Sequence, residues 1–237
     1  MSTEDGRLQT HSSHSNDASD PGFMYKQQWV QDLVSQLCLF VQTNTDWMGV
    51  RDEIDRPARV LDYACGNGAL SKALADVTTH TTFRGIDSSA AQVQRFNDAA
   101  QALPDDSQLR MLAAQGNLQE EDAKFESAEW YHFDVALISM ALHHVSSPSD
   151  MLKKLASRVS TGGCVVIAEF LTEETHLLGD QGHGKWPGFT KQSLQQAMEQ
   201  AGLVDVEMRT DPKPTVIPAE FGGNKQIVFA KGRTVAS

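Results

Sequence analysis

Residues 59–71 read R-V-L-D-Y-A-C-G-N-G-A-L-S, and this stretch decides the fold. A short apolar run ends on a carboxylate, Asp62, and then breaks into small residues that include Gly66 and Gly68. Two interpretations fit: a buried strand that simply turns into a helix, or a strand-to-helix loop that holds a nucleotide. Glycine lets the backbone approach a ligand closely and adopt positive φ. A lone G-x-G also occurs in ordinary turns, so the loop alone does not decide.

Outward from this stretch, apolar runs alternate with amphipathic segments. We predict strands at residues 59–63, 82–87, 109–114, 133–139, 163–170, 203–209 and 226–231, and helices at residues 69–77, 89–103, 148–159 and 190–201. Near-continuous apolar strands between helices indicate a mostly parallel sheet that is covered on both faces. The expected fold class is therefore α/β, a doubly wound, seven-stranded, mostly parallel sheet with helices on both faces.

The N-terminal region divides into two parts. Residues 1–22 are rich in Ser, Asp, Thr and His and are expected to form a flexible tail. Apolar residues then recur every four positions, which predicts an amphipathic helix over residues 25–46. We expect one domain over residues 23–237, with its core in residues 55–232.

Composition limits the class of protein further. The chain has 237 residues, 40% of them hydrophobic, which is enough for one sizeable core. The formal net charge of −11 argues against a nucleic-acid partner. The 3 cysteines are widely spaced, which fits a reducing compartment and neither a disulfide framework nor a zinc site. No apolar run reaches the ~18 residues of a membrane span, and no secretory signal is recognised, so we expect a cytoplasmic location.

Two carboxylates, Asp62 and Asp87, indicate which kind of nucleotide the loop would bind. Asp87 ends the second predicted strand, where an acid can bind both ribose hydroxyls. A dinucleotide site needs G-x-G-x-x-G, but position 71 is Ser, and Asp62 would repel a pyrophosphate. S-adenosylmethionine carries an ammonium, a sulfonium and a ribose but no phosphate, so charge favours it over NAD(P).

An ordered series of segments resembles the motifs of class I S-adenosylmethionine-dependent methyltransferases, and especially of their small-molecule branch. They are V-L-D-Y-A-C-G-N-G, G-I-D-S-S, Q-G-N-L, F-D-V-A-L-I-S-M-A-L-H-H-V, L-K-K-L-A-S-R-V-S-T-G-G-C-V-V-I-A-E-F and F-T-K-Q-S-L-Q-Q-A-M-E-Q-A-G-L. The resemblance covers roughly residues 55–232 and implies a Rossmann-like fold. Ala64 replaces the family's usual first Gly, which is tolerable if its φ is negative. Asn117 replaces the usual Asp, and its carbonyl can still accept from the adenine amine.

The resemblance implies a cofactor site formed by Tyr25, Asp62, Ala64, Gly66, Gly68, Asp87, Ser88, Asn117, Leu118 and Ser139. Asp87 would bind the ribose, and Asn117 with the amide of Leu118 would bind the adenine. Ser139 would contribute through its backbone. Tyr25 would cap the methionyl end, although simple helix packing explains an aromatic residue there equally well. No metal site is expected.

Two histidines follow the fourth predicted strand. Neighbouring residues on an extended segment point in opposite directions, so at most one of His143 and His144 should face the cleft. Glu169 ends the fifth predicted strand, which the family places beside the fourth. We predict His143 with Glu169 as a general base and its orienting partner, and His144 as a structural residue or a pocket residue.

The acceptor side is less defined. Residues 171–189 form a Gly-rich insert suited to a lid, in which His183, Trp186 and Phe189 are candidate acceptor-pocket residues. The fourth strand is followed by S-M-A-L and not by an N-P-P-Y-like tetrad, which argues against a nucleic acid as the methyl acceptor.

We expect in-line methyl transfer to a small organic molecule. The alternatives are an inactive methyltransferase-like binding module, a protein methyltransferase or an NAD(P)-dependent oxidoreductase. The acceptor and the oligomeric state stay open.

Overall fold

The computed structural model describes residues 26–103, 110–174, 188–219 and 222–236. The predicted tail, Tyr25 and most of the predicted lid lie outside these residues. None of the described helices combines the length and apolar character that a membrane span requires.

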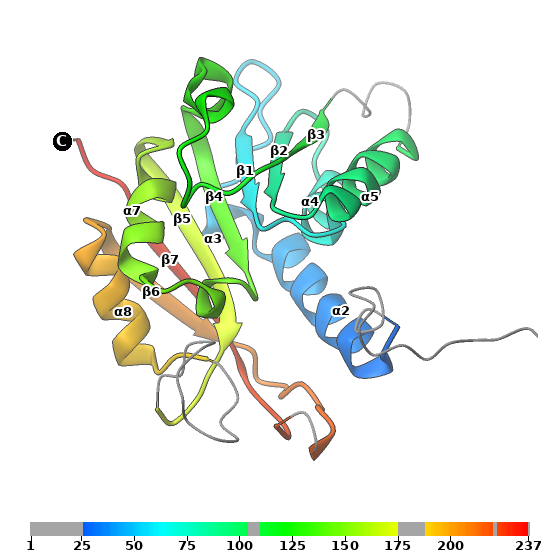
Figure 1. Cartoon of the computed structure of the whole chain (residues 1–237), viewed down its shortest axis with the longest axis vertical. Helices are drawn as coiled ribbons and strands as arrows, with labels where there is room; N and C mark the ends of the chain where they lie inside the picture. The colour runs from blue at the N-terminus through cyan, green and yellow to red at the C-terminus, as the bar shows by residue number, and fades with distance from the viewer. Residues whose placement is uncertain (1–25, 104–109, 175–187, 220–221, 237) are drawn as a thin grey trace, which may run out of the picture.

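A seven-stranded sheet forms the centre of the domain, in the order β3-β2-β1-β4-β5-β7-β6 (Figure 1). The strands from β1 to β5 pair in parallel, and β7 runs antiparallel to both β5 and β6. The strands are β1 Arg59–Tyr63, β2 Thr82–Asp87, β3 Met111–Gln115, β4 Phe133–Ser139, β5 Val159–Phe170, β6 Val204–Thr210 and β7 Ile227–Arg233. The predicted doubly wound, mostly parallel sheet is confirmed.

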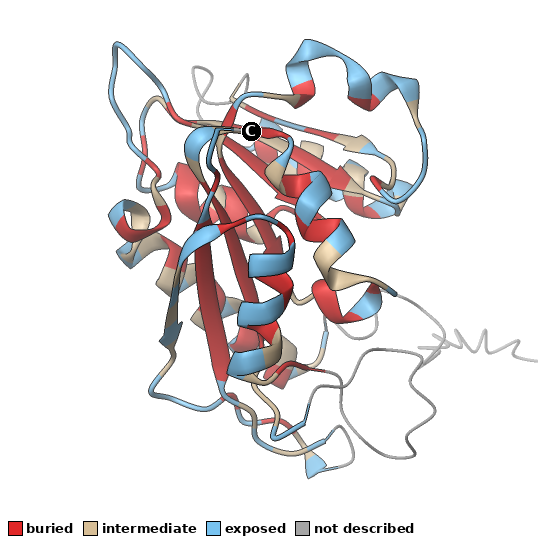
Figure 2. Cartoon of the chain, turned by 90° about the vertical axis from the view of Figure 1, so that its left-hand side faces the viewer, coloured by how far each residue is buried: buried red, intermediate tan, exposed pale blue. Residues whose placement is uncertain are grey.

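Helices cover both faces of the sheet, with α2, α4 and α5 on one face and α7 and α8 on the other (Figure 1). The helices are α2 Gln28–Thr43, α3 Thr45–Met48, α4 Ala69–Ala75, α5 Ala90–Gln101, α7 Pro148–Ala156 and α8 Lys191–Gln200. Short 3₁₀ helices are η1 Ala123–Glu126, η2 Ala128–Trp130 and η3 Leu142–His144. Each face buries its own apolar cluster, and the central strands are buried almost throughout (Figure 2).

The predicted helix over residues 25–46 is shorter than expected and is interrupted. It ends at Thr43, because Asn44 leaves the helical region with φ −129° and its side-chain amide donates to the carbonyl of Phe40 at 2.9 Å. Such local hydrogen bonds compete with the helix ladder. Midway along α2, the Gln36 side chain binds the segment that follows β6. It accepts from the Thr215 hydroxyl at 2.6 Å and donates to the Lys213 carbonyl at 3.2 Å.

The strand order reverses between β1 and β4, which are neighbours although β2 and β3 lie between them in sequence. In open α/β sheets the ligand crevice lies outside the carboxyl ends of the strands at such a switch point. Here those ends are Tyr63 on β1 and Ser139 on β4. The functional site is therefore expected beside these two residues.

Candidate active site

The loop after β1 turns through three residues with positive φ. Gly66 and Gly68 have φ of +54° and +79°, and Gly68 caps α4. A Cβ on Gly68 would also lie 2.6 Å from the Phe96 ring, so both the positive φ and the lack of space require glycine at this position. Ala64 has φ +55°, and the expectation of a negative φ there is wrong. The turn from strand to helix demands this conformation even of an alanine, at a cost of about 1–2 kcal/mol.

Asp87 joins this loop to the start of α5. One carboxylate oxygen accepts from the backbone amide of Gly66 and the other from that of Ser89, each at 2.9 Å. A carboxylate has about four acceptor positions. Asp87 can therefore hold the loop and still accept from the two hydroxyls of a ribose.

Asp62 is buried below the same loop, where its carboxylate accepts from the Ser71 hydroxyl at 2.7 Å. Burial raises the pKa of Asp62 to about 7, the bond from Ser71 opposes the rise, and the charge of Asp87 adds to it. Ser71 marked only a missing glycine in the sequence, yet it is the direct partner of this acid. A cation held beside Asp62 would favour its charged form.

We expect cofactor affinity to fall as the pH drops through the pKa of Asp62. A group with a pKa of about 7 is mostly charged at pH 8 and mostly protonated at pH 6, so affinity should be about tenfold lower at pH 6. Calorimetric titration with S-adenosylmethionine at the two pH values measures this change. His143 and His144 also border the site, so Asp62→Asn is the control that isolates the carboxylate. An equally steep pH dependence in that variant would contradict the assignment.

His143 and Glu169 form a buried pair at the ends of β4 and β5. The ring nitrogen Nδ1 of His143 lies 2.8 Å from Oε2 of Glu169, and Oε1 accepts from the backbone amide of His143 at 3.2 Å. Both side chains are buried, with exposed fractions of 8% and 0%. A carboxylate bound to Nδ1 fixes the ring orientation and its tautomer. This leaves Nε2 as the nitrogen that can accept a proton.

The expectation that only one of the two histidines faces the cleft is wrong. Residues 142–144 form the 3₁₀ helix η3 and not an extended segment, so successive side chains diverge by about a third of a turn. The two rings lie 4.3 Å apart at 37°, and both line the same pocket. Burial lowers the pKa of His144, and the neighbouring His143 lowers it further.

Two adjoining pockets surround these groups. The first, of about 420 Å³, falls in the range of about 300–1,000 Å³ typical of ligand sites. It has an apolar wall on α2 formed by Trp29, Val30, Leu33, Val34 and Leu37. Its other residues include Asp62, Gly66, Ser139 and His143. The buried Ser139 hydroxyl has no hydrogen-bond partner among the described residues, and such a group is usually paired.

The second pocket continues from the first past Asp87 and His144, which border both. Asn117 lies there, but its side-chain carbonyl already accepts from the Tyr63 hydroxyl at 2.8 Å and from the backbone amide of Gln119 at 3.0 Å. An adenine amine would have to replace one of these donors. Burial raises the pKa of Tyr63 to about 12, so this hydroxyl remains a donor. Tyr63 is a pocket residue that the sequence analysis did not select.

The other predicted site residues do not all line these two pockets. Ser88 lines the second pocket, whereas the Leu118 side chain is buried in the core. Phe189 lines neither of these two pockets: it bridges to Leu171 and is buried at 2% in the cluster beneath α7 and α8. His183 and Trp186 lie outside the described residues. Within the described part of the chain, no group of three or more His, Cys, Asp or Glu is arranged to hold a metal ion.

Comparison with known proteins agrees with this geometry. A doubly wound sheet with a glycine loop and acids at its switch point defines a nucleoside-cofactor-binding α/β domain. Residues 35–208 match the family model described as methyltransferase domain. The chain belongs to this family and is a class I methyltransferase domain whose cofactor is S-adenosylmethionine.

Curated relatives include an uncharacterised methyltransferase of Schizosaccharomyces pombe, 26% identical over 63% of this chain and 54% of that protein. The trans-aconitate 2-methyltransferase of Deinococcus radiodurans is 28% identical over 71% of this chain and 67% of that protein. A ubiquinone biosynthesis O-methyltransferase of Coxiella burnetii is 32% identical over 44% of this chain and 40% of that protein. The chain thus spans about half the length of the first of these relatives.

Among solved structures, a geranyl diphosphate methyltransferase in complex with SAM aligns with a TM-score of 0.65 at 14% identity, over 92% of this chain and 93% of that one. A magnesium protoporphyrin IX methyltransferase from Synechocystis PCC 6803 with bound SAM aligns with a TM-score of 0.56 at 18% identity, over 87% and 80%. At these identities the likeness shows the shared fold.

Proposed function

We propose that the protein transfers a methyl group from S-adenosylmethionine to a small organic acceptor that must lose a proton, with His143 as the general base. The observation that carries this proposal is the buried pair of His143 and Glu169, joined at 2.8 Å, whose His143 lines a pocket that Asp62 also lines. A positioned base of this kind contributes about 10²–10⁴-fold to a rate.

The described residues fit the chemical groups of the cofactor. Asp87 would accept from the ribose hydroxyls, and Asp62 supplies a negative charge near the cationic methionyl end. The loop of Gly66 and Gly68 lets the backbone approach, and Ser139 offers a hydroxyl that has no partner within the described part of the chain. When bound, the cofactor supplies an electrophilic methyl group. The contribution of the chain is to hold that methyl group and the acceptor in line, for which alignment provides about 7–11 kcal/mol.

The proton path follows from the pair. Nε2 of His143 would take the proton from the acceptor as the nucleophile attacks, and Glu169 would stabilise the imidazolium that forms. His144, whose pKa is lowered by burial, would remain neutral beside it. The apolar α2 wall of the pocket supports an acceptor with an apolar body. The names of the Deinococcus and Coxiella relatives support small molecules as acceptors.

Two measurements test the proposal in sequence. Calorimetry with S-adenosylmethionine and with NADH should show binding of the first alone, because Asp62 disfavours a pyrophosphate. Turnover should then be measured with labelled cofactor on small phenols, alcohols, thiols, amines and carboxylic acids. Transfer to protein substrates but to no small acceptor would contradict the proposed acceptor class, and binding without any transfer would favour a non-catalytic module.

A further inference from the structure

The segment between β3 and β4 carries the expected adenine contacts at its start and two short 3₁₀ helices further on. Its second half is anchored in the core by Phe125 and Trp130, which are 1% and 4% exposed and meet edge to face with ring centroids 5.0 Å apart. Its first half, residues 116–122, is partly exposed. The position of this first half depends on the buried Leu118 side chain, which is 4% exposed, and on individual polar contacts.

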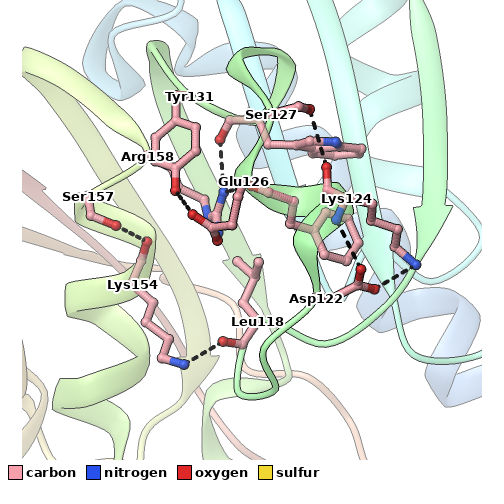
Figure 3. A network of polar contacts seen from close by, with 11 residues as sticks. Leu118, Asp122, Lys124, Glu126, Ser127, Tyr131, Lys154, Ser157 and Arg158 are labelled. Carbon is pink, nitrogen blue, oxygen red and sulfur yellow. Dashed lines mark hydrogen bonds and ion pairs between the residues drawn. The ribbon is translucent and has the colours of Figure 1, made fainter.

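Residues of α7 and of the turn after it make polar contacts with both halves of the segment. Arg158, two residues beyond α7, is buried and donates to the carbonyls of Phe125 and Trp130 and to the carboxylate of Glu126. Glu126 also accepts from the Tyr131 hydroxyl at 2.6 Å. This bond lowers the pKa of Glu126, and the bond from Arg158 lowers it further. Figure 3 shows these groups side by side. The second half of the segment is thus fixed to the end of α7.

One turn earlier on α7, Lys154 reaches the first half. Its ammonium donates to the carbonyl of Leu118 at 2.7 Å (Figure 3). Leu118 follows Asn117, which is bound from the pocket side by the Tyr63 hydroxyl at 2.8 Å. The chain at Asn117 and Leu118 is therefore held from two sides: β1 binds the Asn117 side chain, and α7 binds the carbonyl of the peptide that follows Leu118.

We propose that Lys154 is a positioning residue for the adenine end of the cofactor, acting through the Leu118 carbonyl and touching no ligand itself. A polar group sets specificity only if it is held in place, and removal of its hydrogen-bond partner loosens it. Loss of Lys154 should let the peptide move. Cofactor affinity and discrimination at the adenine amine should then both decrease. This inference rests on the proposed assignment of residues 116–118 to the adenine.

The experiment uses the full chain and measures the Kd of S-adenosylhomocysteine and of its inosine analogue, in which a carbonyl replaces the adenine amine. Lys154→Ala should bind S-adenosylhomocysteine about 3- to 10-fold more weakly, the loss expected for one hydrogen bond. The preference for adenine over inosine should shrink, and kcat at saturating cofactor should stay unchanged. Lys154→Arg, which keeps a donor at this position, should recover most of the affinity.

Lys153→Ala is the matched control, because it removes the same charge from the same helix. The Lys153 ammonium forms an exposed ion pair with Asp150 at 3.7 Å. This variant should bind both analogues like the unmodified protein. An unchanged Kd and adenine preference in Lys154→Ala would overturn the inference and leave the proposed function intact. Equal losses for both analogues would indicate a general structural role and also overturn it. Failure of the unmodified protein to bind S-adenosylhomocysteine would overturn the proposed function.

Discussion

Replacement of His143 by Gln should lower kcat by about 10²–10⁴-fold, the contribution of a positioned general base. The amide of Gln can still donate to Glu169, so the buried carboxylate keeps a partner and the domain should fold. Steady-state kinetics with a hydroxyl-bearing acceptor measures the loss. Cofactor affinity, measured separately by calorimetry, should stay within a few-fold, because the cofactor acids are unchanged.

Two further measurements show whether the ring acts as a base. Glu169→Gln should cost less than the His143 variant, since the ring would keep a hydrogen-bond partner and lose only the charge that stabilises the imidazolium. At saturating S-adenosylmethionine, kcat of the unmodified protein should fall in acid, where a protonated ring cannot accept, and this fall should be absent in His143→Gln. A variant with near-full kcat and an intact acidic limb would remove His143 as the base and indicate an acceptor that ionises on its own.

Asp87→Ala should weaken S-adenosylmethionine binding by about 1–3 kcal/mol, the usual cost of leaving polar partners unpaired. Two losses combine here, because the same carboxylate also holds the Gly66 amide at 2.9 Å. Calorimetry measures the affinity, and thermal unfolding reports the loosened loop. Asp98→Ala is the matched control, since Asp98 lies on the exposed side of α5 and its carboxylate accepts from the Gln94 side chain of the same helix. Unchanged affinity in Asp87→Ala would contradict the ribose assignment.

The sheet could be predicted because its central strands β1, β4 and β5 are mostly apolar and buried. The bounds predicted for β1, β2 and β4 coincide with those observed. The positions of the acids and glycines at strand ends follow from the same pattern, because the carboxyl ends of parallel strands meet at one edge. The adjacency of His143 and Glu169 was inferred from the family's strand order, which the pairing of β4 with β5 reproduces.

The contacts that the sequence did not reveal join elements through side chains. Tyr63 and Asn117 are 54 residues apart, and Lys154 and Leu118 are 36 apart. In neither pair does the sequence around one residue indicate which residue it contacts. Ser71 stands in the sequence at the third glycine position of the dinucleotide motif, and nothing around it indicates that its hydroxyl binds Asp62. Backbone detail was also hidden: an alanine gives no sign that its turn needs positive φ, and L-H-H does not distinguish a 3₁₀ turn from an extended end.

The two hydrogen bonds between Gln36 and the segment after β6 bear on how the enzyme is made. Synthesis begins at the N-terminus, so α2 leaves the ribosome early, but its partners Lys213 and Thr215 follow 177 and 179 residues later. At about 5–20 residues per second, this delay lasts about 10–40 s. During that interval α2 lacks these two hydrogen bonds, whereas α4, which packs against it, has already been synthesised. The pocket wall should therefore be among the last parts of the nascent enzyme to become fixed.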